Sequence, residues 1–454
     1  MKSREATAHH PDTRKRGLAV RYLLVTWLLV VSAVAFIDRT NIAVAGVEIS
    51  KEFRMDNTQL GWVFSAFLVG YAAFQIPGGI FVRRHGARNV LTLSIIWSGT
   101  FVLLTALLPS TIPGALAGLV AMRFLMGAGE AIMYPAMNQF VERWFPMNER
   151  GKANGIIFGG IGLGSGLAPP VATAIILRFG WRILFWCSGI LRLMVGAVWF
   201  LFSRNTPEEH PYVSRKELEL IGAGREDKPQ GAAVPSAPAG LAGKSKPSIP
   251  WGRMFGSKET IGLTASYFTF GYVSWVYFSW FYIYLAQVRH LNLKTTALYS
   301  MFPFIAMALG SLIGGVISDW ISRHYGARAG KSFFPAFALA LTALLLVLGS
   351  YAHSAVTATV VLALGAGALY LSQSSYWAVS ADFGGEHAGM VSGIMNTGCQ
   401  IGGAVTASLT PLIAVHFGWN ASFLTATTLA ALGALAWLVV NPKARLSHSA
   451  AAAA

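Results

Sequence analysis

The chain has 454 residues, of which 54% are hydrophobic and only 12% are charged. About a quarter of the residues of a soluble domain are charged, so this composition excludes an ordinary soluble protein and predicts an integral membrane protein. The two cysteines, Cys187 and Cys399, both fall within predicted helices, so neither a disulfide framework nor a metal cluster is expected.

Hydrophobic stretches long enough to cross a bilayer, which takes about 20 residues, recur twelve times. The first is too long for the core of a signal peptide and is not followed by a small-residue cleavage site, so we expect it to remain as a spanning helix. The stretches predict an all-α membrane protein with twelve transmembrane helices. They lie near 20–45, 58–82, 89–109, 113–140, 153–177, 182–202, 259–288, 295–320, 332–351, 355–380, 388–415 and 419–440.

Lysine and arginine residues are distributed unequally between the two sides of these helices. Of the 35, 26 lie in the two tails and in the loops after even-numbered stretches, six lie in the opposite loops, and Arg39, Arg123 and Arg192 lie within stretches. By the positive-inside rule both termini face the cytoplasm, which predicts a multi-pass protein of the inner (plasma) membrane. The net charge of +16 then reflects topology and lipid headgroups, and no nucleic-acid partner is expected.

Two stretches contain opposite charges. Asp38 and Arg39 are neighbours in the first stretch, and Arg123 and Glu130 lie seven residues apart in the fourth, on one helix face that continues to 134 and 138. Each charge would cost about 2.5 to 3.5 kcal/mol at the centre of a bilayer, so this face should line a wet cavity. A buried structural ion pair is the alternative. Arg192, in the sixth stretch, has no explanation at this stage.

Two motifs occur twice along the chain. RFGWRILF at 178–185 is echoed by HFGWNASF at 416–423, and GGIFVRRHGAR at 78–88 is echoed by GGVISDWISRHYGAR at 314–328. These echoes predict two six-helix pseudo-repeats. Between them, a polar segment predicts a short surface helix followed by a flexible linker rich in Pro and Gly. We expect an N-terminal tail (1–21), an N-terminal bundle (22–203), a linker (204–257), a C-terminal bundle (258–441) and a C-terminal tail (442–454).

This organisation resembles the major facilitator superfamily, in which two helical halves enclose a site at the membrane midplane. The signature turn of that family, after the second helix, is matched within 79–88 by its glycines and by Arg84 and Arg88, although Arg83 stands where the family has Asp. The second copy keeps the acid as Asp319. Because this turn latches the halves together in the family, the resemblance implies gating roles for Arg84, Arg88 and Asp319.

More closely, the chain is similar to the anion:cation symporter family, which includes bacterial galactonate, hexuronate and glucarate permeases and animal sialic acid and vesicular glutamate carriers. The matches are FIDRTNIAVA at 36–45, GWVFSAFLVGYAAFQIPGG at 61–79 and the segment 123–156. The resemblance implies a proton-coupled symporter of a small organic anion such as a sugar acid, working by alternating access. Anion exchange, proton-driven efflux and a non-transporting membrane sensor are the alternatives. A monomer without enzymatic activity or cofactor is expected.

Arg39 is the candidate anchor for the anion, because a guanidinium group can form two parallel hydrogen bonds with a carboxylate. Pairing of Arg39 with Asp38 is disfavoured, since neighbouring side chains on a helix point about 100° apart. The resemblance implies that Arg39 binds substrate and that Asp38 and Glu130 exchange protons. Arg123, on the same face as Glu130, is a further candidate for proton coupling. Burial disfavours a charged carboxylate and so favours its protonation.

Other polar and aromatic residues recur at helical spacing. The family's pattern implies a place in the substrate cavity for three of them, Tyr71, Trp377 and Asn396. Gln75 and Gln373 lie one helical turn from the first two and are further candidates for substrate binding.

The seventh stretch is aromatic on all sides, which predicts that most of its rings contact lipid or the membrane interface. Within it, Trp275 and Tyr277 are candidate gates, and Tyr277 is also a candidate for substrate binding. In the fifth stretch, Ile161 occupies a position that is often polar in sugar-acid carriers, which leaves open a smaller or less hydroxylated anion.

Overall fold

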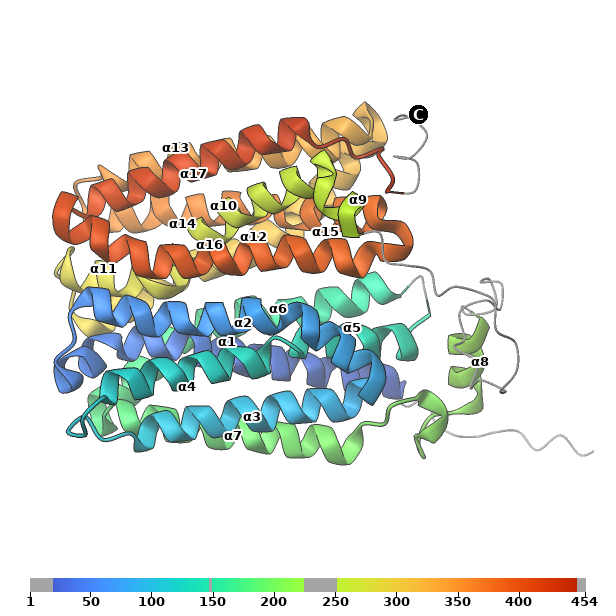
Figure 1. The fold of residues 1–454 in the computed structure, drawn as a ribbon, viewed down its shortest axis with the longest axis horizontal. Helices are drawn as coiled ribbons and strands as arrows, with labels where there is room; N and C mark the ends of the chain where they lie inside the picture. The colour runs from blue at the N-terminus through green and yellow to red at the C-terminus, as the bar shows by residue number, and fades with distance from the viewer. Residues whose placement is uncertain (1–18, 147–148, 224–250, 447–454) are drawn as a thin grey trace, which may run out of the picture.

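The computed structural model describes residues 19–146, 149–223 and 251–446, and almost all of these residues are helical. Long helices lie side by side along one axis (Figure 1). The first group comprises α1 (Val20–Phe53), α2 (Asn57–His85), α3 (Ala87–Leu107), α4 (Ala115–Glu130), α5 (Met133–Trp144), α6 (Arg150–Phe179) and α7 (Trp181–Phe202). The second group comprises α10 (Lys258–Ser279), α11 (Phe281–Gln287), α12 (Leu293–Tyr325), α13 (Phe334–Ser350), α14 (Ala355–Leu371), α15 (Gln373–Gly384), α16 (Ala388–Phe417) and α17 (Trp419–Val439).

Within the part of the chain that the structure describes, eleven helical spans are long and apolar enough to cross a membrane. Two of them consist of two helices in series, α4 with α5 and α14 with α15. The remaining predicted span is formed by α10 and α11, whose tyrosine, serine and threonine residues make it less apolar. The twelve-helix membrane fold predicted from the sequence is confirmed.

Matching glycine turns support the two pseudo-repeats. Gly180, between α6 and α7, has φ 84° and ψ 165°, and Gly418, between α16 and α17, has φ 83° and ψ 163°. Gly86 and Gly326 form a second matched pair, with φ 82° and 93°. Residues with side chains rarely adopt positive φ, so these turns require glycine. The echoed sequence motifs therefore encode the same sharp turn in both halves.

The expectation that most rings of the seventh span contact lipid is wrong. Phe268 is half-buried, and all other rings from Tyr267 to Tyr284 are buried. The polar ends of several rings reach other helices: the Tyr277 hydroxyl donates to the Leu362 carbonyl at 2.8 Å. Because α10 packs against both α16 and α17 and also reaches α1, it lies inside the protein, where Tyr and Trp find hydrogen-bond partners.

The two groups of helices meet where α2 packs against α16 and α6 against α12. Hydrogen bonds join them at the end of the bundle away from the start of α1. These bonds link Asn57 to Gln287 at 3.2 Å, Ser65 to the Ala404 carbonyl at 2.9 Å and Thr173 to Tyr282 at 3.0 Å. Nearer the other end, the groups meet through the rings of Phe158 and Trp377, whose centroids lie 6.4 Å apart.

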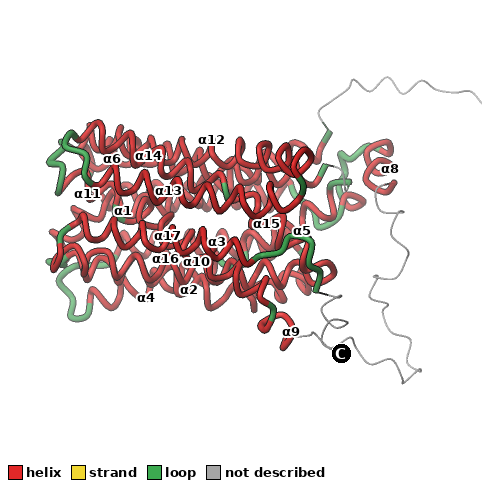
Figure 2. The backbone as a smooth tube through the Cα atoms, turned by 90° about the horizontal axis from the view of Figure 1, so that it is seen from above, coloured by secondary structure: helices red, strands yellow, loops and turns green. Residues whose placement is uncertain are grey.

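The linker begins with a short 3-10 helix, Pro207–Glu209, and the surface helix α8 (Arg215–Ala223), which lies beyond the end of the bundle (Figure 2). The Glu217 carboxylate accepts hydrogen bonds from the backbone N–H groups of Val20 and Arg21, at 3.2 and 3.1 Å. It thereby satisfies the free N–H groups in the first turn of α1. A further helix, α9 (Trp251–Gly256), precedes α10. The segment predicted to be flexible, 224–250, lies outside the described residues.

We expect cleavage within residues 225–250 to leave transport nearly unchanged. The Pro- and Gly-rich composition of this segment predicts no packed structure that a cut would disrupt. A protease site inserted there, and cut after reconstitution, should keep uptake within about twofold of the uncut protein. The matched control is the same site inserted within α8, which would disrupt the cap formed by Glu217. Loss of uptake in folded, inserted protein cut at 225–250 would instead indicate a regulatory or gating linker.

Candidate functional site

Four charged side chains form a buried network within the first group of helices. The Arg39 Nε and Nη2 atoms both donate to Glu130 Oε2, at 2.9 and 2.8 Å. Arg192 Nη1 donates to Asp38 Oδ2 at 2.6 Å, and its Nη2 lies 2.7 Å from Glu130 Oε1. These side chains are at most 4% exposed. The order of the contacts is Asp38, Arg192, Glu130, Arg39, with alternating charges.

The helix positions of these residues explain the pairing. Asp38 and Arg39 are neighbours on α1 and point in different directions, so Asp38 meets α7 whereas Arg39 meets α4. The expectation that they do not pair with each other is confirmed. Asn41, one turn later, donates to Ser188 at 2.8 Å and holds α1 against α7 beside the network.

Glu130 is the last residue of α4, and α5 begins only at Met133. The helical hydrogen bonds are broken here, but Ala131 and Ile132 keep helical dihedral angles, and Tyr134 lies near Arg39, the partner of Glu130. Pro135 explains the break, because it lacks the N–H that would bond to the carbonyl four residues earlier. Tyr134, beyond the break, forms a hydrogen bond of 2.8 Å with Ser32 of α1.

Arg123 does not form an ion pair within the part of the chain described. It donates to the Met126 sulfur at 3.2 Å, lies over the Phe67 ring at 5.0 Å, and leaves Nε without a hydrogen-bond partner. It is only 3% exposed. The ion-pair partners of Glu130 are thus Arg39 and Arg192, whereas Arg123 has no carboxylate within ion-pair distance among the described residues.

Together, the three intramembrane arginines and two intramembrane acids carry one net positive charge. An unpaired charge in a low-dielectric interior is costly unless an opposite charge compensates it. The whole cluster therefore favours an additional anion, which the arrangement can accept without any change in the protein's own charges.

Arg39 is surrounded by aromatic rings. Its guanidinium carbon lies 4.4 Å from the ring centroid of Phe36, 5.1 Å from that of Phe67 and 5.2 Å from that of Tyr71. Each ring attracts a cation and limits contact with water. Gly127 allows the close approach of α4 to α2 that builds this pocket, because a Cβ atom there would overlap the Phe67 carbonyl.

The other residues expected to bind substrate lie on both groups of helices. Trp377 lies 6.4 Å from the Phe158 ring and 6.3 Å from the Tyr267 ring. The Phe158 ring in turn stacks on that of Tyr134 at 5.6 Å. These four rings form a row that crosses from one half to the other. No signal in the sequence had singled out Phe158.

Glutamine side chains with free polar atoms lie on α2 and α16. Gln75 Oε1 and Gln400 Oε1 are buried and, within the described residues, lack a hydrogen-bond partner. Gln373 and Asn396 are half-buried. Tyr277 is tied to α14 by the hydrogen bond described above, so its place in substrate binding stays a prediction, as it does for the other candidates.

The candidate gating residues lie at the end of the bundle where α1 begins. Arg88 donates to the Phe200 carbonyl, at 3.2 Å from Nε and 2.6 Å from Nη2, and so ties the start of α3 to the end of α7. Arg84 and Asp319 are exposed. Their gating role stays a prediction.

Arg192 is the residue of this network that sequence reasoning left unexplained. The signal was present, because an arginine in the middle of an apolar helix needs a buried counter-charge. What the sequence could not supply was the partner, since α7 meets α1 and α4 only through the tertiary fold.

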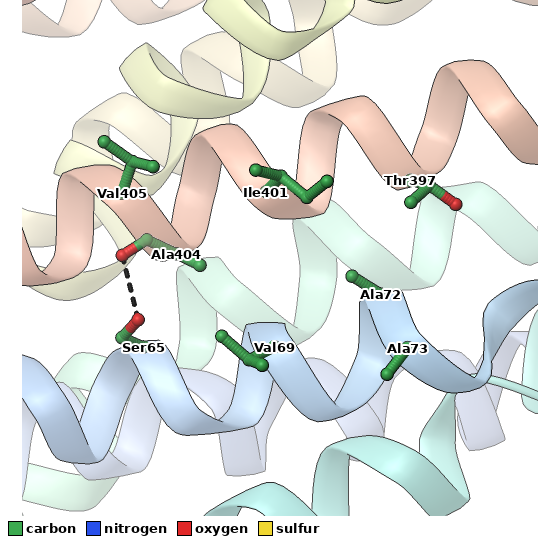
Figure 3. Close-up of a pocket in the computed structure, with 8 residues that line it drawn as sticks. All are labelled: Ser65, Val69, Ala72, Ala73, Thr397, Ile401, Ala404 and Val405. Carbon is green, nitrogen blue, oxygen red and sulfur yellow. Dashed lines mark hydrogen bonds between the residues drawn. The ribbon is translucent and has the colours of Figure 1, made fainter.

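A separate groove lies between α2 and α16, as Figure 3 shows. Its walls are apolar apart from Ser65 and Thr397, and none of its residues belongs to the charged network. Val69 and Ile401 are 47% and 46% exposed, respectively. This groove therefore faces outward from the helices and is a different feature from the site built around Arg39. The lining residues are Ser65, Val69, Ala72, Ala73, Thr397, Ile401, Ala404 and Val405.

Known proteins resemble this chain over most of its length. The model of the Major Facilitator Superfamily matches residues 28–407. A probable sulfoacetate transporter of Cupriavidus necator is 32% identical, over 94% of this chain and 95% of the relative. A probable galactarate/D-glucarate transporter of Escherichia coli (strain K12) is 29% identical, over 92% and 93% of the two chains.

A solved structure has the same fold. It is the crystal structure of a bacterial homologue of the human lysosomal transporter Spinster, in an inward-facing and unoccupied conformation. The TM-score is 0.71 with 16% sequence identity, and the match covers 92% of this chain and 97% of that chain. At this identity, the likeness concerns the fold alone.

Proposed function

The chain belongs to the Major Facilitator Superfamily and is a membrane transporter, and from this premise we propose that it moves a small organic anion together with protons. The anion binds at Arg39 between the two halves. Asp38 and Glu130 are the acids that exchange protons during the cycle. The protein works as a monomer in the inner membrane, with both termini in the cytoplasm.

The observation that carries this proposal is the pairing of Arg39 with Glu130. Both donated hydrogen bonds of Arg39 end on a single oxygen of Glu130, at 2.9 and 2.8 Å. An incoming carboxylate or sulfonate needs the same donors, so it competes with the Glu130 carboxylate for them. Loss of the negative charge on Glu130, or its compensation by another cation, favours anion binding. Proton uptake and anion uptake are linked in this way.

The way the halves meet supports the proposal of alternating access. Their hydrogen bonds, such as those of Asn57 with Gln287 and of Thr173 with Tyr282, gather at the end away from the start of α1. The positive-inside rule assigns that end to the outer face. In the proposed cycle this conformation is closed at the outer face, and the ring contact of Phe158 with Trp377 separates when substrate is released to the cytoplasm.

The substrate is a sugar acid or a shorter sulfonated or carboxylated anion. The relatives support both choices, because one is a probable sulfoacetate transporter and another a probable galactarate/D-glucarate transporter. Ile161, on α6, is apolar and packs against the hydrophobic core, which favours a substrate with few hydroxyl groups. Anion exchange is the second candidate, because Arg39 would accept an anion from either side.

We expect purified protein in liposomes to accumulate at least one of sulfoacetate, D-glucarate and galactarate when the outside is made acidic. Accumulation should collapse with a protonophore, because the proton gradient then no longer drives uptake. Labelled anion uptake with and without the imposed gradient measures this. Uptake that requires a counter-anion inside and ignores the gradient would establish exchange instead, and absence of any movement would contradict the proposal.

A further inference from the structure

Building on the proposed function, we infer that Arg192 is a relay that couples protonation of Asp38 to the release of Arg39 for the anion. Arg192 touches no substrate in this scheme. It acts by moving its charge between two carboxylates, and it is thus a positioning residue for transport.

Arg192 bridges the two acids. Its Nη1 donates a hydrogen bond of 2.6 Å to Asp38 Oδ2. Its Nη2 forms an ion pair of 2.7 Å with Glu130 Oε1. Because one guanidinium group contacts both carboxylates, a change in the charge of Asp38 acts directly on the contact of Arg192 with Glu130.

Of the two acids, Asp38 is the one whose protonation costs less free energy. Glu130 contacts two arginines, whereas Asp38 contacts only Arg192. Among the described residues, the second oxygen of Asp38, Oδ1, is buried without a hydrogen-bond partner. A proton on Oδ1 displaces no hydrogen-bond donor and weakens one ion pair, that of Asp38 with Arg192, whereas a proton on Glu130 weakens its ion pairs with both arginines.

The relay follows from these contacts. When a proton binds Asp38 Oδ1, the attraction that holds Arg192 to Asp38 weakens and the guanidinium turns to Glu130. Glu130 then has the whole charge of Arg192 as its counter-charge, and Arg39 exchanges Glu130 for the anion. The net charge of the cluster rises from one to two on protonation and falls by one for each carboxylate or sulfonate group of the anion that binds there.

Among the charged groups that face Asp38, Arg192 is the nearest. The helix α6, which packs most closely on α1, has no charged side chain from 153 to 177. The charged groups that face Asp38 are Arg192 of α7 and, farther away, Glu130 and Arg123 of α4. On the other side of α1, the phenols of α2 and α5 lie near Arg39.

Three variants test the relay: Asp38→Asn, Arg192→Gln and the double variant. Binding of labelled sulfoacetate, D-glucarate and galactarate is measured in detergent from pH 5.5 to 8.5. Arg182→Gln is the matched control, because this arginine is also on α7 but binds Glu52 at the far end. Where one proton accompanies one anion, the wild-type Kd should rise by up to about tenfold per pH unit.

Asp38→Asn imitates the protonated acid, so its Kd at pH 8.5 should equal the low-pH value of the wild type and should not vary with pH. Arg192→Gln should bind weakly and without pH dependence, since nothing replaces Arg39 on Glu130. The double variant should match Arg192→Gln, because the effect of Asp38→Asn requires Arg192. This non-additivity distinguishes a relay from two independent structural roles.

A pH-dependent Kd in Asp38→Asn, parallel to that of the wild type, would overturn the relay. So would a double variant that binds as tightly as Asp38→Asn. If Arg192→Gln does not fold, the pH dependence of the Kd of Asp38→Asn still tests the relay. If the folded wild type binds none of the three anions at any pH, the proposed function fails, and that outcome is distinct from both results above.

Discussion

Replacing Arg39 by lysine should remove most substrate binding even though the positive charge is kept. Arg39 donates from Nε and Nη2 together, and aromatic rings surround its guanidinium. A lysine ammonium is a compact point charge that cannot reproduce the two fixed N–H donors of the guanidinium group. Losing one hydrogen bond to a charged group costs about 1.5 to 3 kcal/mol, which corresponds to roughly tenfold to 150-fold weaker binding. Equilibrium binding of the labelled anions measures the change.

The matched control is Arg182→Lys, since Arg182 binds Glu52 outside the network. It should bind the anion as the wild type does. Near-normal affinity in Arg39→Lys, in protein that is folded and inserted, would remove Arg39 from the anchor role and would point to Arg123, a buried cation with no ion pair among the described residues, as the alternative.

The fold could be predicted almost entirely from the sequence, because length, hydropathy and positive charge in a membrane protein report directly on spans. The echoed turns of Gly180 and Gly418 even revealed the internal repeat. The span formed by α10 and α11 is the exception. Its rings suggested contact with lipid, yet they pack inside, because composition alone cannot say which neighbours a helix will have.

The site was predictable only in part. Asp38, Arg39 and Glu130 could be selected because charges in apolar helices are rare, and the structure brings all three together. Their pairing could not be predicted: Arg123 shares a helix with Glu130 but is not its partner, and Arg192 enters from α7. Local spacing determines which side chains share a face, whereas contacts between helices depend on packing across the bundle.

Replacing Glu130 by glutamine should separate binding from coupling. The variant is permanently neutral, so Arg39 loses its competitor and stays available to the anion at every pH. Protonation of Asp38 can still turn Arg192, but the movement no longer changes the partner of Arg39. We therefore expect Glu130→Gln to bind substrate and exchange it across the membrane, while net uphill uptake driven by a pH gradient is lost.

Other roles for Glu130 lead to different results. If Glu130 only stabilises the fold, removing its charge leaves Arg39 and Arg192 partly uncompensated and costs about 3 to 5 kcal/mol. Binding, exchange and thermal stability would then fall together. A membrane sensor that does not transport would show no exchange with or without the substitution.

The most direct test of proton-coupled anion transport is therefore counterflow measured beside gradient-driven uptake, in the same liposomes containing Glu130→Gln. Glu142→Gln, a substitution on α5 outside the network, serves as the matched control and should retain both activities. For Glu130→Gln, our account predicts counterflow close to that of the wild type and no accumulation above equilibrium when the outside is acidic. Retained uphill accumulation in this variant would contradict the account.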